Sequence, residues 1–118
     1  MRFMIIRKAD KETEAGALPA PEMMAAMMKY NGELAAAGAL LQAEGLKPSS
    51  EGARVSFAGG KPLVTDGPFV ETKELIAGFT MIDVKSREEA IAWVKRWPAI
   101  DGNAVLEIRP FYESGDFQ

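Results

Sequence analysis

The chain has 118 residues, which is enough for one domain with a hydrophobic core and short for two. Its apolar fraction of 47% and charged fraction of 26% are typical of soluble globular proteins and exclude extended disorder. A net charge of −3 without a basic run argues against a nucleic-acid partner, and the absence of Cys and His excludes disulfides, thiolate nucleophiles, histidine proton shuttles and the usual zinc sites.

The N-terminal apolar run is short. Phe3 to Ile6 form a four-residue stretch that Arg7 and Lys8 interrupt. This is too short for the core of a signal peptide and for a membrane span. We therefore expect a cytoplasmic protein without a membrane partner.

The first half of the chain predicts a strand, a loop and a helix. Residues 2–8 are rich in β-favouring side chains, whereas residues 9–20 mix charged residues with Gly and Pro. Pro21 suits the first turn of a helix, and Gly38 is a plausible stop. The apolar stripe of this helix consists of Met23, Met27, Tyr30 and Leu34.

The second half predicts five strands and a second helix. The strands are expected over residues 40–46, 54–58, 62–65, 75–84 and 104–111. Gly59-Gly60-Lys61 predicts a hairpin connection between two of them. Ser86 with Glu89 has the spacing of a capping box, so it predicts a helix start, and Pro98 ends that helix.

This order of elements is β-α-β, a hairpin, and again β-α-β. It predicts an α+β fold of the ferredoxin-like, split β-α-β kind, with both helices on one face of an antiparallel sheet. We expect a single domain over residues 1–118.

The alternation along the strands predicts which side chains face the helices. The expected helix-facing set is Met4, Ile6, Ile82, Val84, Leu106 and Ile108. The opposite set is Phe3, Ile5, Arg7, Phe79, Met81, Asp83, Val105, Glu107, Arg109 and Phe111.

That second set is apolar toward one end, which is unfavourable on a monomer. It predicts a homodimer through the sheet face, with Phe79, Met81 and either Phe3 or Phe111 in the interface. The alternative is that a loop or the tail from Glu113 onward covers this face.

The most distinctive stretch is the run of nine residues from Asp66 to Glu74. It reads Asp66, Gly67, Pro68, Phe69, Val70, Glu71, Thr72, Lys73 and Glu74. With Gly78-Phe79, Ala90, Trp93, Pro98 and Glu107-x-Arg109-Pro110, it makes the chain resemble the YCII-related family, in the branch named for its DGPF motif.

The resemblance implies a ferredoxin-like, dimeric α+β barrel without an established reaction. Relatives of this branch are often found beside extracytoplasmic-function sigma factors, which implies a regulatory setting and a possible sigma-factor partner. The His–Asp pair proposed for better-studied members does not carry over, because this chain has no histidine.

The nine-residue run has a structural and a functional interpretation. In the first, the Asp66 turn and Pro68 make a stiff corner that only anchors Phe69 in a core. In the second, Asp66 or Glu71 is a general base beside cationic groups in a cleft. The expected ligand-binding residues are then Arg54, Lys73, Glu107 and Arg109.

Three functions remain open from the sequence. The first is a homodimer that binds a small polar or anionic molecule or acts in regulation. The second is a cofactor-independent lyase or isomerase that uses Asp66 or Glu71. The third is an interaction module for a sigma factor. No cofactor is expected, and no metal, because the carboxylates at 66, 71 and 74 match no calcium loop.

Overall fold

The structure, a computed structural model, describes all 118 residues. Four strands form one antiparallel sheet in the order β2-β5-β1-β6, with bounds β1 Arg2–Lys8, β2 Leu40–Gly45, β5 Ile76–Asp83 and β6 Leu106–Pro110. The strand pair of each half, β1 with β2 and β5 with β6, is split by a strand of the other half. This confirms the expected ferredoxin-like α+β fold.

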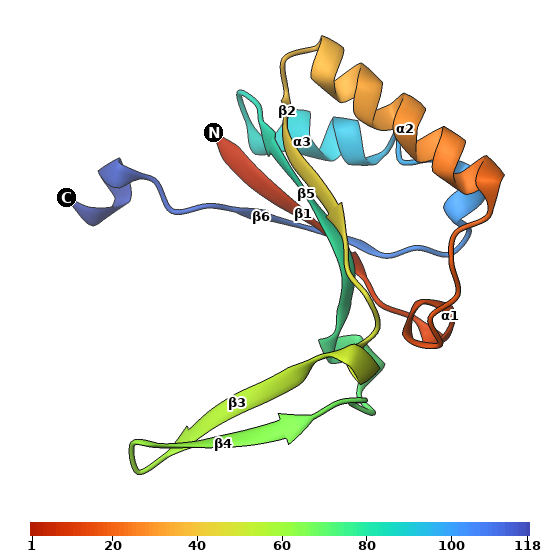
Figure 1. The fold of residues 1–118 in the computed structure, drawn as a ribbon. Coiled ribbons are helices and arrows are strands. Elements are labelled where there is room, and N and C mark those ends of the chain that lie inside the picture. The colour runs from red at the N-terminus through yellow and green to blue at the C-terminus, as the bar shows by residue number, and fades with distance from the viewer.

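Two longer helices, α2 (Pro21–Ala36) and α3 (Arg87–Val94), lie on the same side of the sheet (Figure 1). α2 begins at Pro21 and stops before Gly38, whose φ of 74° suits glycine. α3 begins after Ser86, whose Oγ accepts the backbone N–H of Glu89 at 3.1 Å. Both predicted helix starts are confirmed, and no helix has the length and apolar character needed to cross a bilayer.

A short helix, α1 (Lys11–Glu14), lies where the sequence predicts only a loop. The Asp10 carboxylate accepts the Thr13 N–H at 2.9 Å, and the Thr13 hydroxyl accepts the Asp10 N–H at 2.9 Å. This reciprocal cap holds a single turn that its low apolar content would not predict.

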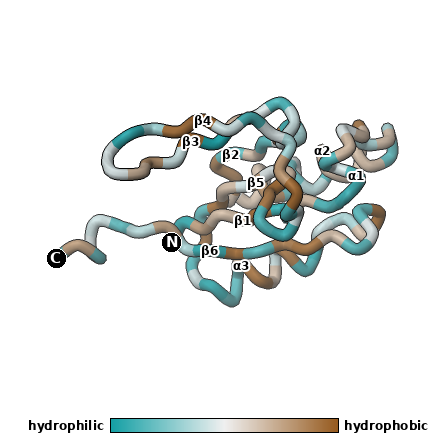
Figure 2. Tube along the Cα trace, turned by 90° about the horizontal axis from the view of Figure 1, so that it is seen from below, coloured by the Kyte–Doolittle hydropathy of each residue, from teal (hydrophilic) through white to brown (hydrophobic).

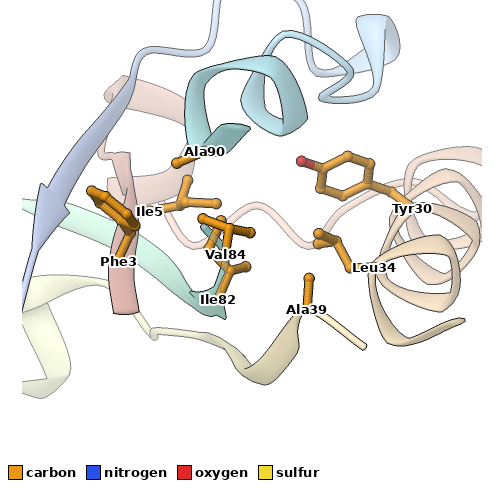
Figure 3. Close-up of a cluster of buried hydrophobic side chains, with 8 residues drawn as sticks. All are labelled: Phe3, Ile5, Tyr30, Leu34, Ala39, Ile82, Val84 and Ala90. Carbon is orange, nitrogen blue, oxygen red and sulfur yellow. The ribbon is translucent and has the colours of Figure 1, made fainter. Parts of the chain in front are cut away.

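The core lies between the sheet and the two helices (Figure 3). Its eight side chains are Phe3, Ile5, Tyr30, Leu34, Ala39, Ile82, Val84 and Ala90. Burial of each large apolar side chain contributes about 1.5–3 kcal/mol. The Tyr30 hydroxyl donates to the Trp93 carbonyl at 2.6 Å, so the polar end of this buried ring is satisfied.

The first strand has the opposite phase from the predicted one. Phe3 and Ile5 are 1% and 0% exposed and face the helices, whereas Met4 and Ile6 face away. Every residue from Phe3 to Ile6 is apolar, so alternation gives no signal there. The pairing of Phe3 with Ile82 in β5 decides the phase. Of the two alternatives predicted for the dimer interface, Phe3 is thus ruled out by its burial under the helices, and Phe111 stays a prediction.

The sheet face away from the helices, called here the open face, carries two ordered rows. Across β2, β5, β1 and β6 the first row is Glu44, Phe79, Ile6 and Glu107. The second row is Gln42, Met81, Met4 and Arg109. In both rows the central pair is apolar and the outer pair is polar. The open face therefore has an apolar centre that no helix covers (Figure 1).

A hairpin of β3 (Ala53–Ala58) and β4 (Lys61–Asp66), called here the arm, forms its own two-stranded sheet. Gly59 and Gly60 have φ values of 59° and 81° and connect the strands in the predicted tight turn. The arm projects on the side of the main sheet away from α2, and so does the C-terminal tail (Figures 1 and 2).

Candidate ligand-binding cleft

A cleft of about 1340 Å³ lies on the helix side of the sheet. Met23, Met27 and Asn31 of α2 line it, together with Thr80 of β5 and Arg7 of β1. The cleft is larger than many small-molecule pockets, and it combines apolar walls with a few polar groups. It is therefore the principal candidate for a binding site.

Arg7 is the best-held charged group of the cleft. Its Nη2 and Nε donate to the two carboxylate oxygens of Asp101 at 2.8 and 3.2 Å, and the two side chains are 15% and 14% exposed. Its Nη1 donates to the Lys8 carbonyl at 2.7 Å and to Asp10 at 3.0 Å. The hydrogen bonds from Arg7 to Asp101 hold the pKa of Arg7 above its usual value. Four of the five guanidinium N–H groups are thus used, which leaves one on Nη2.

Asp101 is also tied to the core. The Trp97 indole Nε1 donates to Asp101 Oδ2 at 2.8 Å. The Trp97 ring in turn meets the buried Tyr30 ring edge-on, with 5.4 Å between centroids. This chain of contacts fixes the Arg7–Asp101 pair in position from α2.

Asp10 has both carboxylate oxygens engaged. Oδ1 accepts the Thr13 N–H at 2.9 Å and Oδ2 accepts from Arg7 at 3.0 Å. The backbone N–H of Thr13 and then the Arg7 guanidinium hold the pKa of Asp10 below its usual value. Asp10 is therefore ionised at neutral pH and poorly suited to accept a proton from a ligand.

Two polar side chains of the cleft wall stand out by their burial. The Asn31 Oδ1 atom is buried and accepts no hydrogen bond. Thr80, at 3% exposed, is the most deeply buried polar residue of the chain. A buried acceptor without a partner costs about 1–3 kcal/mol, so Asn31 is held at an energetic cost beside the cleft.

The charges around the cleft are predominantly acidic. Three cationic and five acidic residues line it, which gives 3 − 5 = −2, and the side chain of one of them, Glu44, belongs to the open face. This balance disfavours an anionic ligand.

None of the site residues predicted from the sequence lines this cleft. Asp66 is exposed at the end of β4 and forms no ion pair, and Glu71 and Lys73 are exposed beside it. Glu107 and Arg109 belong to the open face, on the other side of the sheet. Within one chain Asp66 therefore meets neither Arg54 nor Arg109, and the functional roles of these residues remain predictions.

The structure does bring Arg54 of the arm together with two residues of the Asp66–Glu74 run. Its guanidinium lies 3.8 Å from the centroid of the Phe69 ring, and Nη2 lies 3.8 Å from a Glu74 carboxylate oxygen. Phe69 is half-buried at this point. The contact joins the arm to the corner at its base.

The corner itself is packed on the loop that precedes the arm. The Gly67 N–H donates to the Gly52 carbonyl at 3.0 Å, and the Phe69 N–H donates to Ser49 Oγ at 3.0 Å. Ser49 in turn donates its backbone N–H and its hydroxyl to the Glu14 carboxylate of α1. These contacts agree with the structural interpretation in that the corner turns and holds the chain. Phe69, which that interpretation places in a core, is instead half-buried against Arg54 and is not part of the core.

Sequence reasoning missed Arg7, Asp101, Trp97 and Asn31 as a group. The available signal was Arg7, a cation inside an otherwise apolar strand, which predicts a buried partner. Its partner Asp101 is 94 residues away and lies in a 3₁₀ turn, Ala99–Asp101, that no pattern marks.

Comparison with known proteins identifies the family of this chain. The sequence model of the YCII-related domain matches residues 1–113. The chain belongs to the YCII-related domain family. This YCII-related chain is also 35% identical over 83 residues to an uncharacterised protein of Rhizobium meliloti (strain 1021), which covers 68% of this chain and 67% of that one.

A solved structure has a similar fold. It is 5-chloro-2-hydroxyhydroquinone dehydrochlorinase from Burkholderia phenoliruptrix AC1100, in complex with 2,5-dihydroxybenzoquinone. The TM-score is 0.52 at 15% identity, and the match covers 98% of each chain. At this identity the likeness establishes the fold of the YCII-related chain and nothing about its chemistry.

Proposed function

We propose that this YCII-related protein binds a small, uncharged, hydroxylated ring molecule in the cleft beside α2. The observation that carries the proposal is the Asn31 side chain, whose Oδ1 is buried without a partner at the cleft wall. Rotation about the last side-chain torsion of Asn exchanges the positions of its oxygen and nitrogen. Asn31 can therefore present an acceptor to a ligand hydroxyl.

The other walls fit the same ligand class. Met23 and Met27 offer adaptable apolar surfaces that suit a flat ring. The remaining N–H of Arg7 Nη2 is a donor for a ligand oxygen. The acidic balance of the lining favours an uncharged molecule over the anionic one that the sequence left open.

The fold neighbour supports this ligand class by analogy. That enzyme is named for a chlorinated hydroxyhydroquinone, which is a hydroxylated ring, and its complex holds a dihydroxybenzoquinone. Both are ring compounds with several oxygen substituents. The analogy concerns the ligand class and does not extend to the reaction.

We infer binding rather than catalysis. A lyase or isomerase needs a general base within reach of the ligand. The two carboxylates held in the cleft wall, Asp10 and Asp101, each have both oxygens engaged, and the pKa of Asp10 is lowered. The other acidic residues of the lining, Glu12, Glu44 and Glu51, are exposed, and Asp66 and Glu71 do not line the cleft. The arrangement therefore supports recognition of a ring compound more directly than its turnover.

Calorimetry with hydroquinone tests the proposal. We expect binding of hydroquinone but not of 1,4-dimethoxybenzene, which keeps the ring and lacks the donors. Asn31→Leu should weaken binding by about tenfold or more, because one hydrogen bond in a buried site is lost. Asp66→Asn is the matched control and should bind like the wild type.

The same variants show whether the proposal fails. Equal binding of both ring compounds, or loss of binding in Asp66→Asn with Asn31→Leu unaffected, would place the site elsewhere. Because Asn31→Leu removes an unsatisfied buried acceptor, it should not lower the free energy of unfolding of the free protein. A urea titration therefore separates loss of the site from loss of the fold.

We further propose that two copies associate through the open face. The apolar centre of this face consists of Met4, Ile6, Phe79 and Met81. A second copy would cover it by packing sheet on sheet, which leaves the cleft accessible on the helix side. The polar outer residues of both rows would then lie at the rim.

A further inference from the structure

The arm has no core of its own. All twelve residues of β3 and β4 are exposed, although Val55, Phe57, Leu63 and Val64 are large and apolar. A two-stranded hairpin in water is marginally stable by itself. We therefore expect the arm to be stabilised by packing its apolar side chains against another surface.

The register of the hairpin sorts its side chains by face. Val55 pairs with Val64 and Phe57 pairs with Pro62, so these four share one face. The other face pairs Arg54 with Thr65, Ser56 with Leu63 and Ala58 with Lys61. The third pair on the first face, Ala53 with Asp66, lies at the base of the arm. Beyond this base the first face is a continuous apolar strip, whereas the other face is mostly polar.

The direction and length of the arm determine which surface its apolar face can contact. The arm leaves the sheet on the side of the open face, away from α2 (Figures 1 and 2). Six residues per strand at roughly 3.3 Å each give a length of about 20 Å. Packed sheets lie only about 10 Å apart. An arm of this length would extend past the open face and alongside a second copy packed on it.

The total surface of the chain is consistent with such a partner. It exposes 8341 Å², whereas a compact monomer of its 12.8 kDa exposes about 6300 Å². The excess of about 2000 Å² per copy has the size that large, permanent dimers bury. Its radius of gyration of 16.3 Å also exceeds the 13–14 Å or so of a compact chain of this length.

Charge favours the same partner. The arm carries Arg54, Lys61 and Asp66, which gives a net charge of 2 − 1 = +1, and Asp66 lies at its base. The outer ends of the first row of the open face carry Glu44 and Glu107. A second copy of the chain thus offers acidic groups at the rim that a cationic arm would approach.

We propose that the arm is a dimerisation element that packs its Val55, Phe57, Pro62 and Val64 face against a second copy of this chain. The proposal rests on the proposed dimer through the open face and adds a second contact to it. The Asp66-Gly67-Pro68-Phe69 corner holds the base of the arm on Ser49 and so orients it before the partner arrives.

Sedimentation of two matched variants tests the arm. Phe57→Asp places a carboxylate on the apolar face and Leu63→Asp places one on the other face, and the two wild-type side chains are 71% and 62% exposed in the single chain. We expect Phe57→Asp to raise the dimer dissociation constant by about tenfold or more, and Leu63→Asp to sediment like the wild type. Circular dichroism confirms that both variants fold.

Thiol protection provides a second measurement, because the chain has no cysteine of its own. Phe57→Cys should react with a maleimide about tenfold more slowly than Leu63→Cys at concentrations where the protein is dimeric, and equally fast when it is diluted to monomer.

The outcomes separate the two proposals. A dimer that Met81→Asp dissociates and Phe57→Asp does not, with equal thiol reactivity at positions 57 and 63, would overturn the role of the arm and keep the open-face dimer. A wild type that is monomeric at high micromolar concentration would overturn both.

Discussion

Gly67 is packed so closely on the preceding loop that no side chain fits there. A Cβ at this position would lie 1.7 Å from the Ser49 carbonyl oxygen, which is backbone and cannot give way easily. In the same loop, the Gly52 carbonyl accepts the Gly67 N–H and the Ser49 hydroxyl oxygen accepts the Phe69 N–H. At the residue scale, the distinctive corner of the sequence thus has a steric reason.

The first prediction compares two glycine substitutions. Gly67→Ala should lower the free energy of unfolding by about 1–3 kcal/mol, because the loop must move to admit the methyl group. Gly32→Ala should raise it by about 1 kcal/mol, because Gly32 lies in α2 with nothing within 4 Å of the added Cβ. Urea titrations measure both, and similar shifts of the same sign would show that the corner is not tightly packed.

The residues of the cleft were the least predictable from the sequence. Arg7 is recognisable as a cation inside an apolar strand, but Asp101 meets it only through the tertiary fold. Asn31 directly follows Tyr30 of the apolar stripe of α2, and no neighbouring residue in the sequence indicates that its side-chain oxygen lacks a hydrogen-bond partner. The Asp66–Glu74 run is conspicuous because its backbone geometry is restrictive, and conspicuous residues need not be the ones that line a cleft.

Tyr30 joins the two long helices. Its ring is 3% exposed, and its hydroxyl donates from α2 to the Trp93 carbonyl of α3 at 2.6 Å. Burial raises the pKa of Tyr30 to about 12. The folded state therefore favours the neutral phenol, and its stabilising contribution is complete below pH 10 or so and is lost as the pH rises toward 12.

The second prediction follows from the raised pKa of Tyr30. Between pH 9 and 12 the wild type should lose up to about 3 kcal/mol more stability than Tyr30→Phe, at roughly 1.4 kcal/mol per pKa unit. Tyr30→Phe lacks the hydroxyl and shares every other titrating group. Urea midpoints of both proteins across this range measure the effect. A stability difference that stays constant with pH would contradict the burial of this hydroxyl.

The third prediction concerns the start of α3. Ser86→Ala should cost about 1 kcal/mol, because the Glu89 N–H loses its acceptor at 3.1 Å. Ser50→Ala is a suitable control, since that exposed hydroxyl caps no helix. If both variants unfold at the wild-type urea concentration, the cap contributes nothing measurable.

At the element scale the sequence predicted more than it did for the cleft. Helix starts at Pro21 and Ser86 and the turn at Gly59-Gly60 were predictable, because each depends on local backbone chemistry. The strand order follows from the connection rules. The phase of β1 did not follow, because four consecutive apolar residues fit either face and only long-range pairing decides.

The molecule as a whole is broad and thin, with principal extents of 46, 45 and 18 Å. Its core occupies one side of the sheet, while the open face and the arm present apolar surface on the other. Both surfaces lie on the same side, so one partner could cover both. The cleft lies on the side that this partner would leave free.

The fourth prediction tests the open face. Met81→Asp should shift the sedimenting species toward monomer, because a carboxylate would be placed unpaired in the apolar centre of the interface. Met24→Asp, on the exposed side of α2, is the matched control and should leave the oligomeric state unchanged. Equal sedimentation of the two variants would argue against association through this face.

The central claim is that ligands enter the cleft beside α2 and do not bind at the Asp66–Glu74 run. An NMR titration of ¹⁵N-labelled protein with hydroquinone tests it directly, because the chain has two tryptophans and only Trp97 lines the cleft. We expect saturable shifts of the Asn31 side-chain amide and the Trp97 indole N–H, while the Trp93 indole moves less. Shifts confined to residues 66–74 or to Arg109, with Asn31 and Trp97 unmoved, would contradict the account.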